Sequence, residues 1–181
     1  LVGAVNPLSF GEFTLYEGRS SYTIQSANIT NYFADLRTDI EGAYYGFYFL
    51  EIAGYYTKEF NDEREMLGLL YQSMKALLNP HIPNLLIRYI FELKSRPAVF
   101  SARKGGLVCS DCGADVKDGI ILDNSTLFCM QFIESSRIEK LYTFNVTEQV
   151  LAQLGTVMKR LMDLYVDKKF KSLEILETLL R

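Results

Sequence analysis

The chain has few of the residues that catalytic and metal sites normally use. Its 181 residues include one histidine, His81, and three cysteines. Catalysis by histidine needs a nucleophile and an orienting partner, whereas a lone histidine beside prolines indicates a surface turn. A small, odd number of cysteines argues against a disulfide-stapled secreted domain and favours a reducing cytoplasm. The sequence therefore predicts a cytoplasmic protein and gives no histidine-based catalytic constellation.

Long apolar runs and bulk positive charge are also absent. No stretch reaches the roughly 18 to 20 apolar residues of a membrane span, and the opening "LVGAVNPLSF" lacks the features of a signal peptide. The net charge is -3, so any binding of nucleic acid must come from local basic patches. With 49% hydrophobic and 13% aromatic residues, the chain has enough apolar surface for a folded core.

Two periodicities divide the chain. Residues 12–16, "EFTLY", and 21–25, "SYTIQ", alternate in polarity around a Gly18-Arg19 turn, which predicts a β-hairpin. A two-stranded hairpin is marginal in water, and no later segment supplies further strands. From Asn28 onward the spacing is helical. We therefore predict a mainly helical body over residues 28–181, preceded by an incomplete sheet within residues 1–27.

Apolar residues at spacings of three and four predict the helices. A short helix leading into a long one is expected from Phe33, Leu36, Ile40, Tyr44, Phe47 and Leu50 or Glu51. The next helix is expected to follow a cap at Asn61 or Asp62 and to bury Leu67, Leu70 or Tyr71, Met74 and Leu78. The aromatic run "AYYGFYFLEIAGYY" at 43–56 is interpreted as core rather than as a base-stacking surface.

Capping residues place the remaining helices. Pro83 suits the start of "NLLIRYIFELK". Asp123, Asn124 or Ser125 precedes "TLFCMQFI", in which Cys129 is expected to be a small buried residue. Asn145 and Glu148 resemble a capping box that opens a helix through Tyr165, and a short helix is expected to close the chain.

The stretch "GGLVCSDC" at 105–112 holds a C-x-x-C pair, Cys109 and Cys112. Two thiolates at this spacing are typical of a zinc knuckle, although a structural zinc site needs four ligands. A plain loop and a redox motif are the alternatives. The redox motif requires a helix after the pair, and "GADVKDG" does not predict one. Residues 95–119 are therefore interpreted as an insertion that resembles a zinc knuckle, with zinc as the one cofactor this pattern suggests.

Several stretches together resemble the RecO family of bacterial recombination mediators. They are "LVGAVNPLSFGEFTLYEGRSSYTIQSANITNYF", "LIRYIFELK", "FSARKGGLVCSDC", "LYTF" and "DKKFKSLEILETL", and they occur in order along nearly the whole chain. The resemblance implies a protein that is not an enzyme, with an N-terminal OB-fold barrel, of which the hairpin is a remnant, a helical body and, in many members, a four-cysteine zinc site. It also implies binding and annealing of DNA strands, action with RecR and with the C-terminal tail of the single-stranded-DNA-binding protein, and a nucleoid-associated location.

Two departures from the family pattern are expected to matter. The barrel is truncated, and between "FELKS" and "RPAVF" the family usually has a longer segment with the first C-x-x-C. The helical pattern ends abruptly against "AVF" at this join. We therefore expect Ser95 and Arg96 not to be bonded neighbours, because a segment with the other cysteine pair lies between them.

Two basic clusters are candidates for DNA contact. The first consists of Lys159, Arg160, Lys168, Lys169 and Lys171, and the second of Arg96, Arg103 and Lys104. Lysines near helix ends often only face solvent and complement the helix dipole. A solvent-facing role without DNA contact therefore stays open for both clusters. The sequence favours a DNA-binding mediator that binds single- and double-stranded DNA. The alternative is a helical adaptor that binds only proteins, in an apolar groove rimmed by basic residues.

Overall fold

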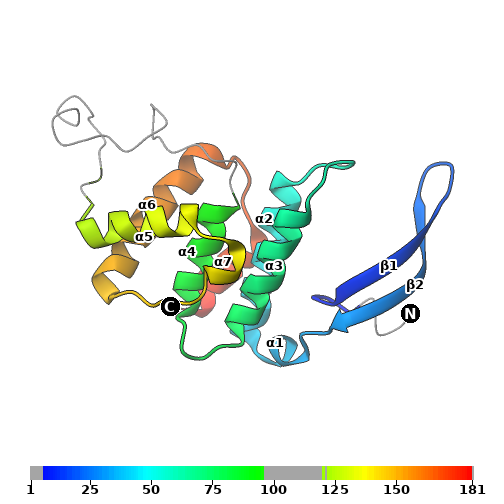
Figure 1. Ribbon diagram of the computed structural model, residues 1–181, viewed down its shortest axis with the longest axis horizontal. Helices are drawn as coiled ribbons and strands as arrows, with labels where there is room; N and C mark the ends of the chain where they lie inside the picture. The colour runs from blue at the N-terminus through cyan, green and yellow to red at the C-terminus, as the bar shows by residue number, and fades with distance from the viewer. Residues whose placement is uncertain (1–5, 96–119, 121, 181) are drawn as a thin grey trace.

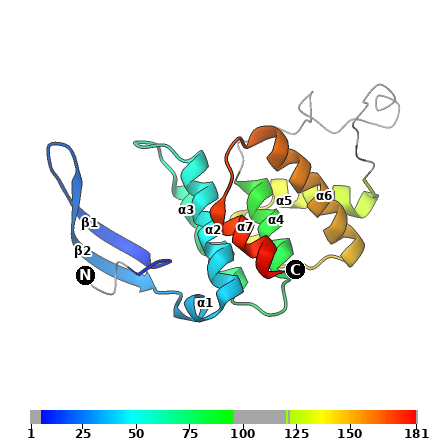
Figure 2. The same cartoon turned by 180° about the vertical axis from the view of Figure 1, so that it is seen from behind.

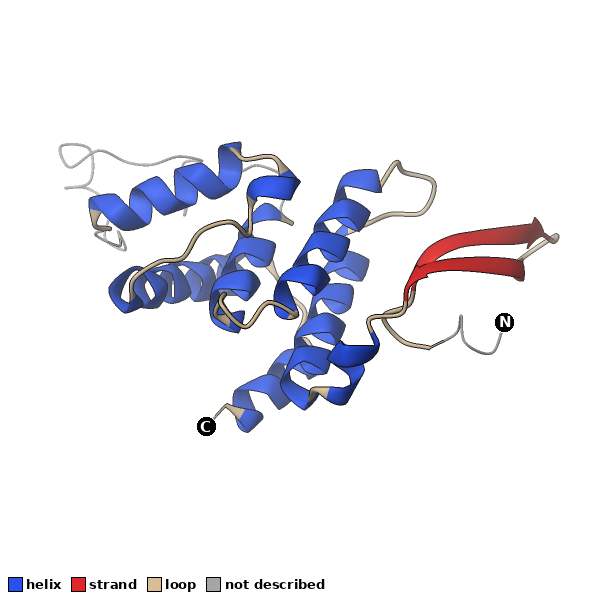
Figure 3. Ribbon diagram, turned by 60° about the horizontal axis from the view of Figure 1, so that its bottom comes forward, coloured by secondary structure: helices blue, strands red, loops and turns tan. Residues whose placement is uncertain are grey.

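The computed structural model describes residues 6–95, 120 and 122–180. A two-stranded sheet precedes a body of helices, as Figures 1 and 3 show. The strands are β1 (Phe10–Glu17) and β2 (Tyr22–Asn31). The helices are α1 (Ala34–Thr38), α2 (Ile40–Tyr56), α3 (Arg64–Leu77), α4 (Asn84–Lys94), α5 (Asn124–Ser135), the short 3₁₀-helix η2 (Ile138–Lys140), α6 (Glu148–Tyr165) and α7 (Lys171–Leu179). The predicted mainly helical class with an N-terminal hairpin is confirmed.

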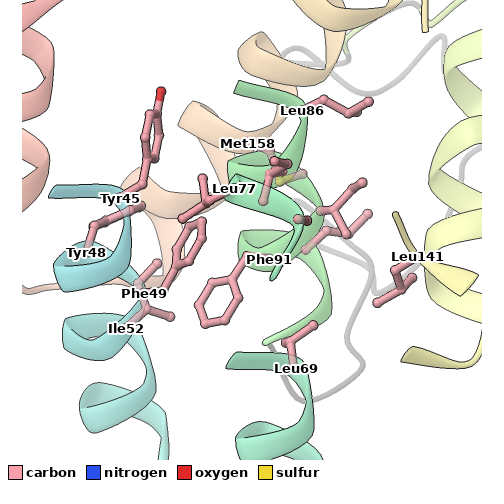
Figure 4. Close-up of a cluster of buried hydrophobic side chains, with 14 of the residues drawn as sticks. Tyr45, Tyr48, Phe49, Ile52, Leu69, Leu77, Leu86, Phe91, Leu141 and Met158 are labelled. Atoms are coloured by element: carbon pink, nitrogen blue, oxygen red, sulfur yellow. The ribbon is translucent and has the colours of Figure 1, made fainter. Parts of the chain in front are cut away.

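Helix α4 lies at the centre of the helical body and contacts α2, α3, α5 and α6. Its Leu86, Ile87, Ile90 and Phe91 are completely buried. Phe91 stacks on Phe49 of α2, with ring centroids 4.3 Å apart, and the close-up in Figure 4 shows this pair in the middle of the core. Burial of such aromatic side chains is the main source of stability in a domain of this size.

Helix α2 buries a different face from the predicted one. Its buried large residues are Tyr45, Tyr48, Phe49 and Ile52. By contrast, Ile40 and Leu50 are exposed, and Tyr44 and Phe47 are only partly buried. The prediction of an aromatic core over residues 43–56 is confirmed, but the predicted stripe was wrong. Because this helix is apolar on nearly every side, its spacing alone could not identify the side that faces the core.

The predicted helix starts are partly right. Asp123 caps α5, and its carboxylate accepts a hydrogen bond from Thr126 N–H at 2.7 Å. Helix α6 is capped by Thr147, whose hydroxyl accepts from Val150 N–H, rather than by Asn145. Of the residues predicted to be buried by α3, Leu70 and Met74 are buried, whereas Leu67 in the helix and Leu78, directly after it, are exposed. Helix α3 begins at Arg64. Glu63 before it makes no side-chain cap bond, but the carboxylate of Asp62, one of the two predicted caps, accepts a hydrogen bond from Arg64 N–H at 3.2 Å.

The hairpin keeps its apolar residues on one face by means of irregular pairing. Thr14 pairs with Ser26 while Leu15 pairs with Ile24, so Gln25 has no partner and forms a bulge. Without this bulge, Ala27 would lie on the opposite face from Ile24, because side chains alternate along a strand. The bulge therefore restores one apolar face on β1 and β2. Strand β2 also continues to Asn31, beyond the predicted change to helical spacing at Asn28.

Only the base of the hairpin packs on the helices. Phe10 lies 4.6 Å from the ring of Tyr71 in α3, and Phe33 contacts the same ring. Leu8 packs against α2 at Gly46, where an added Cβ would lie 3.1 Å from its side chain. The rest of the hairpin extends away from α2 and α3 in both Figure 1 and Figure 2. Among the described residues it pairs with no third strand.

Among the residues that the structure describes, none of the helices combines the length and the apolarity needed to span a membrane.

Candidate nucleic-acid interface

The segment that links α6 to α7 is anchored by one aromatic side chain. Phe170 is 3% exposed and packs edge-on against Tyr48 and Tyr55 of α2, with centroids 5.5 and 6.1 Å away. Figure 2 shows this segment running beside α2 before the chain turns into α7. Removal of a buried Phe from water contributes about 1.5 to 3 kcal/mol, so the contact fixes the position of the linker.

Two hydrogen bonds hold the linker on either side of Phe170. The hydroxyl of Tyr55 donates to Asp167 at 2.8 Å. The hydroxyl of Ser172 donates to the carboxylate of Glu51 at 2.9 Å. The bond to Asp167 is the main cause that raises the pKa of Tyr55. Both bonds connect the segment to α2, so the backbone between Asp167 and Ser172 has a defined path.

Three lysines of the predicted basic cluster project from this anchored segment. Lys168, Lys169 and Lys171 are all exposed, and the ammonium group of Lys168 lies 5.8 Å from the centre of the Phe170 ring. Lys171 is the first residue of α7, and this helix start has no side-chain cap. Cations are unfavourable at a helix N-terminus, because free N–H groups already make that end positive. The dipole explanation therefore does not apply to Lys171.

The same end of α7 has the features of a phosphate contact. Unpaired backbone N–H groups and lysine side chains both favour an anion. One acid, Glu174, lies in the first turn, and Asp167 already accepts the Tyr55 hydroxyl. The structure thus brings positive groups of two kinds together at one place. Sequence reasoning found the lysines from their density but not the helix start between them.

The other predicted basic residues divide into two groups. Lys159 and Arg160 are exposed on α6, in the part of that helix that leads to the linker. Arg96, Arg103 and Lys104 lie outside the described residues. Contact of either group with DNA stays a prediction.

A buried charged cluster that the sequence did not predict lies behind the anchor. The carboxylate of Glu92 in α4 is fully buried and accepts hydrogen bonds from Tyr48 at 2.6 Å and from Arg88 at 2.7 Å. Burial raises the pKa of the Tyr48 hydroxyl, and the negative charge of Glu92 raises it further. Burial lowers the pKa of Arg88, but the attractions of Glu92 and of the tyrosine hydroxyls together outweigh it and raise the pKa overall. Tyr48 thus connects this cluster to Phe170.

The predicted zinc ligands, Cys109 and Cys112, lie outside the described residues, as does Arg96 of the predicted break after Ser95. The described part of the chain contains no group of three side chains able to ligate a metal. Cys129 is buried in α5, and burial raises the pKa of its thiol to about 11. The predicted role of Cys129 in the core is confirmed.

Comparisons with known proteins point to one family. The family model described as "Recombination protein O C terminal" matches residues 94–174. A "DNA repair protein RecO" of Acetivibrio thermocellus is 26% identical over 200 residues, which cover 99% of this chain and 80% of the relative. Proteins of the same name from Alkaliphilus metalliredigens and Dehalococcoides mccartyi are 25% and 20% identical, and they cover 97% and 100% of this chain. No solved structure matches the chain.

The alignment length also shows that one relative has residues without a counterpart in this chain. The aligned region of 200 residues is longer than the 181 residues of the chain, so the Acetivibrio relative has residues without a counterpart here. The position of these residues after Ser95 stays a prediction. Matches of this kind recur in several relatives at 20–26% identity. The resemblance to the RecO family is therefore confirmed, and the chain is similar to the RecO proteins over nearly its whole length.

Proposed function

We propose that this protein acts in DNA repair and recombination as a mediator that binds DNA without changing it chemically. The names of its relatives support the role in DNA repair. The observation that carries the binding step is the anchored segment at the start of α7. There Phe170 fixes the backbone, while Lys168, Lys169 and Lys171 project into solvent beside free helix N–H groups.

Contacts of this kind are electrostatic and independent of base sequence. Lysines bind phosphates as point charges, and an uncapped helix start adds backbone donors. A mediator needs such binding, because it must hold single strands for a short time and release them to pairing. We propose that Lys159 and Arg160 extend this surface along α6, and that annealing and recombinase loading depend on it.

The first prediction concerns the lysines. Replacing Lys168, Lys169 and Lys171 together by alanine is expected to weaken binding of a single-stranded oligonucleotide and to flatten its salt dependence. Each lost phosphate contact removes about 0.7 from the slope of log K against log salt for single strands. Fluorescence anisotropy at several salt concentrations measures both quantities.

The matched control has the same change in net charge at other exposed lysines. Lys58, Lys75 and Lys140 serve for this purpose, since they lie on or beside α2, α3 and η2. Their triple alanine variant is expected to retain the steep salt slope. Equal slopes in the two triple variants would mean that only net charge matters, and the proposed surface at α7 would be wrong.

Partner proteins are the second part of the proposal. Exposed apolar side chains lie on the two helices that the lysine-bearing linker joins: Leu164 on α6, and Ile175 and Leu179 on α7. An acidic peptide with a hydrophobic end would match this combination, and the C-terminal tail of the single-stranded-DNA-binding protein has that chemistry. RecR is proposed as the other partner. A purely protein-binding adaptor is the alternative function, and it is favoured if the lysine variant leaves DNA binding unchanged.

Zinc binding through Cys109 and Cys112 is likewise a proposal. Four ligands are needed for a structural site, so a second cysteine pair from the segment found in relatives would have to complete it. The metal content of the purified chain, compared with that of a relative that carries both pairs, distinguishes a zinc site from a plain loop.

A further inference from the structure

Helix α2 has an apolar side that no described residue covers. Glu41 and Glu51 are its only charged residues. One side packs on α3 and α4, a second on α7, and Leu8 covers Gly46. One turn beyond Gly46, Leu50 is 41% exposed, and a Cβ added at Gly54 would meet no atom within 4 Å. A helix that is apolar on every side is normally covered on every side.

Leu67 of α3 extends this uncovered apolar side of α2, and we call Leu50, Gly54 and Leu67 together the strip. Tyr71 of α3 is covered by Phe10 at the base of the hairpin. Leu67 lies one turn nearer the start of α3, and thus on the same side of the helix, but it is 51% exposed. Leu8 and Phe10 therefore cover only the end of the strip that lies near Gly46 of α2 and Tyr71 of α3. The half that approaches the turn between α2 and α3 has no cover from any residue that the structure describes.

The turn at the end of the strip holds an aromatic side chain in solvent. Phe60 is 92% exposed and has a φ of 67°, a left-handed conformation that is uncommon for a bulky residue. The backbone around it is braced, since the Lys58 N–H donates to the Glu63 carboxylate at 3.2 Å. Strain of this kind is found more often at functional positions than elsewhere. Folding alone gives no reason to hold Phe60 there.

The charge of the turn limits what the strip can bind. Residues 57–65, "TKEFNDERE", hold four acids and two bases. The guanidinium of Arg64 is bound to the carboxylate of Asp62. Glu59 and Glu65 are exposed. This end of the strip would repel phosphate and attract basic side chains.

We propose that Leu50, Gly54, Phe60 and Leu67 form a docking surface for an amphipathic helix of another protein. That helix has an apolar face that lies along the strip and lysines or arginines at the end that meets the acidic turn. Helices commonly bind in this way to a groove between two antiparallel helices. Phe60 then packs on the last apolar turn of the partner, and Glu59 and Glu65 select for its charge.

The test uses the full chain and two synthetic peptides. One has leucines at positions i, i+3, i+4 and i+7 with lysines at the other positions, and the second replaces each lysine by glutamate. Fluorescence anisotropy is expected to show binding of the basic peptide only. Leu67→Glu is expected to weaken it roughly tenfold or more, as at a central apolar contact. Phe60→Ala is expected to weaken it as well, whereas the matched control Phe128→Ala, at an exposed phenylalanine of α5, has no effect.

Three results would overturn the proposal. The first is equal binding of both peptides, and the second is unchanged binding to Leu67→Glu while circular dichroism shows an intact fold. The third is self-association in sedimentation experiments that Leu67→Glu abolishes, which would assign the strip to a second copy of the chain. The charge reversal Glu59→Lys with Glu65→Lys adds a positive test, since it should shift preference toward the acidic peptide. The α7 lysine variant should bind the basic peptide normally, so this inference stands apart from DNA binding.

Discussion

At the scale of single residues, two buried tyrosines of α2 differ in whether their hydroxyl groups have a hydrogen-bond partner. Tyr45 and Tyr48 are both buried, at 1% and 0% exposure. The hydroxyl of Tyr48 donates to Glu92, whereas the hydroxyl of Tyr45 has no hydrogen-bond partner in the described part of the chain. A buried polar group without a partner is destabilising, and a paired one is costly to disrupt. The two positions therefore form a matched pair for mutation.

We expect Tyr48→Phe to lower the free energy of unfolding by about 1–3 kcal/mol, because it removes one of two donors to a buried carboxylate. Tyr45→Phe is expected to be neutral or slightly stabilising, since it removes an unpaired hydroxyl of the same kind. Urea denaturation monitored by circular dichroism measures both. Similar losses in the two variants would mean that the bond to Glu92 contributes little.

Sequence reasoning could not identify this cluster. Arg88 and Glu92 are four residues apart, a spacing that is common on solvent-facing sides of helices. Glu92 is nevertheless fully buried, because α2 places Tyr48 against it. The pattern of α4 alone gives no sign of that neighbour. By contrast, the burial of Cys129 was predictable, because its helix supplies apolar residues on both sides.

At the scale of elements, helix existence was more predictable than helix orientation. The start of α4 after Pro83 and that of α5 after Asp123 follow from local capping chemistry. The face of α2 depends on contacts with α3, α4 and α7, which are distant in sequence, so its pattern was ambiguous. The lysines of the linker were found from charge density. Their arrangement was not, since it depends on Phe170 packing against α2.

The anchor itself provides the element-scale prediction. Phe170→Ala removes a buried ring and is expected to lower the free energy of unfolding by about 3–5 kcal/mol. It should also weaken DNA binding under conditions in which the chain stays folded, because Lys168, Lys169 and Lys171 lose their fixed spacing. Phe128→Ala is the control, since that ring is exposed and its loss should change neither quantity.

Denaturation and oligonucleotide anisotropy, measured on the same preparations, separate the two effects. Loss of stability with unchanged affinity would show that the lysines act as a mobile charged segment. In that case the anchor would be only a structural contact between α2 and α7.

At the scale of the whole molecule, the helical body and the hairpin differ in completeness. The helices enclose a continuous core, but the apolar face of the hairpin stays in solvent, with Leu15 and Ile24 exposed. Among the described residues both hairpin edges are also unpaired. Exposed apolar strands with open edges tend to associate with other chains.

The last prediction follows from this exposed face. Leu15 and Ile24 are direct cross-strand partners, and neither belongs to the buried core or packs against it. We expect the 181-residue chain to self-associate as its concentration rises, and the double change Leu15→Thr with Ile24→Thr to reduce this association. Threonine keeps a high strand propensity, so the hairpin should persist and the thermal unfolding of the helices should not change. Sedimentation velocity over a range of concentrations tests the expectation.

A chain that stays monomeric throughout, or a double variant that associates as before, would show that the hairpin face is protected in another way. Because Leu67→Glu alters only the strip on α2 and α3, comparison of the two variants tells hairpin association apart from docking at that strip.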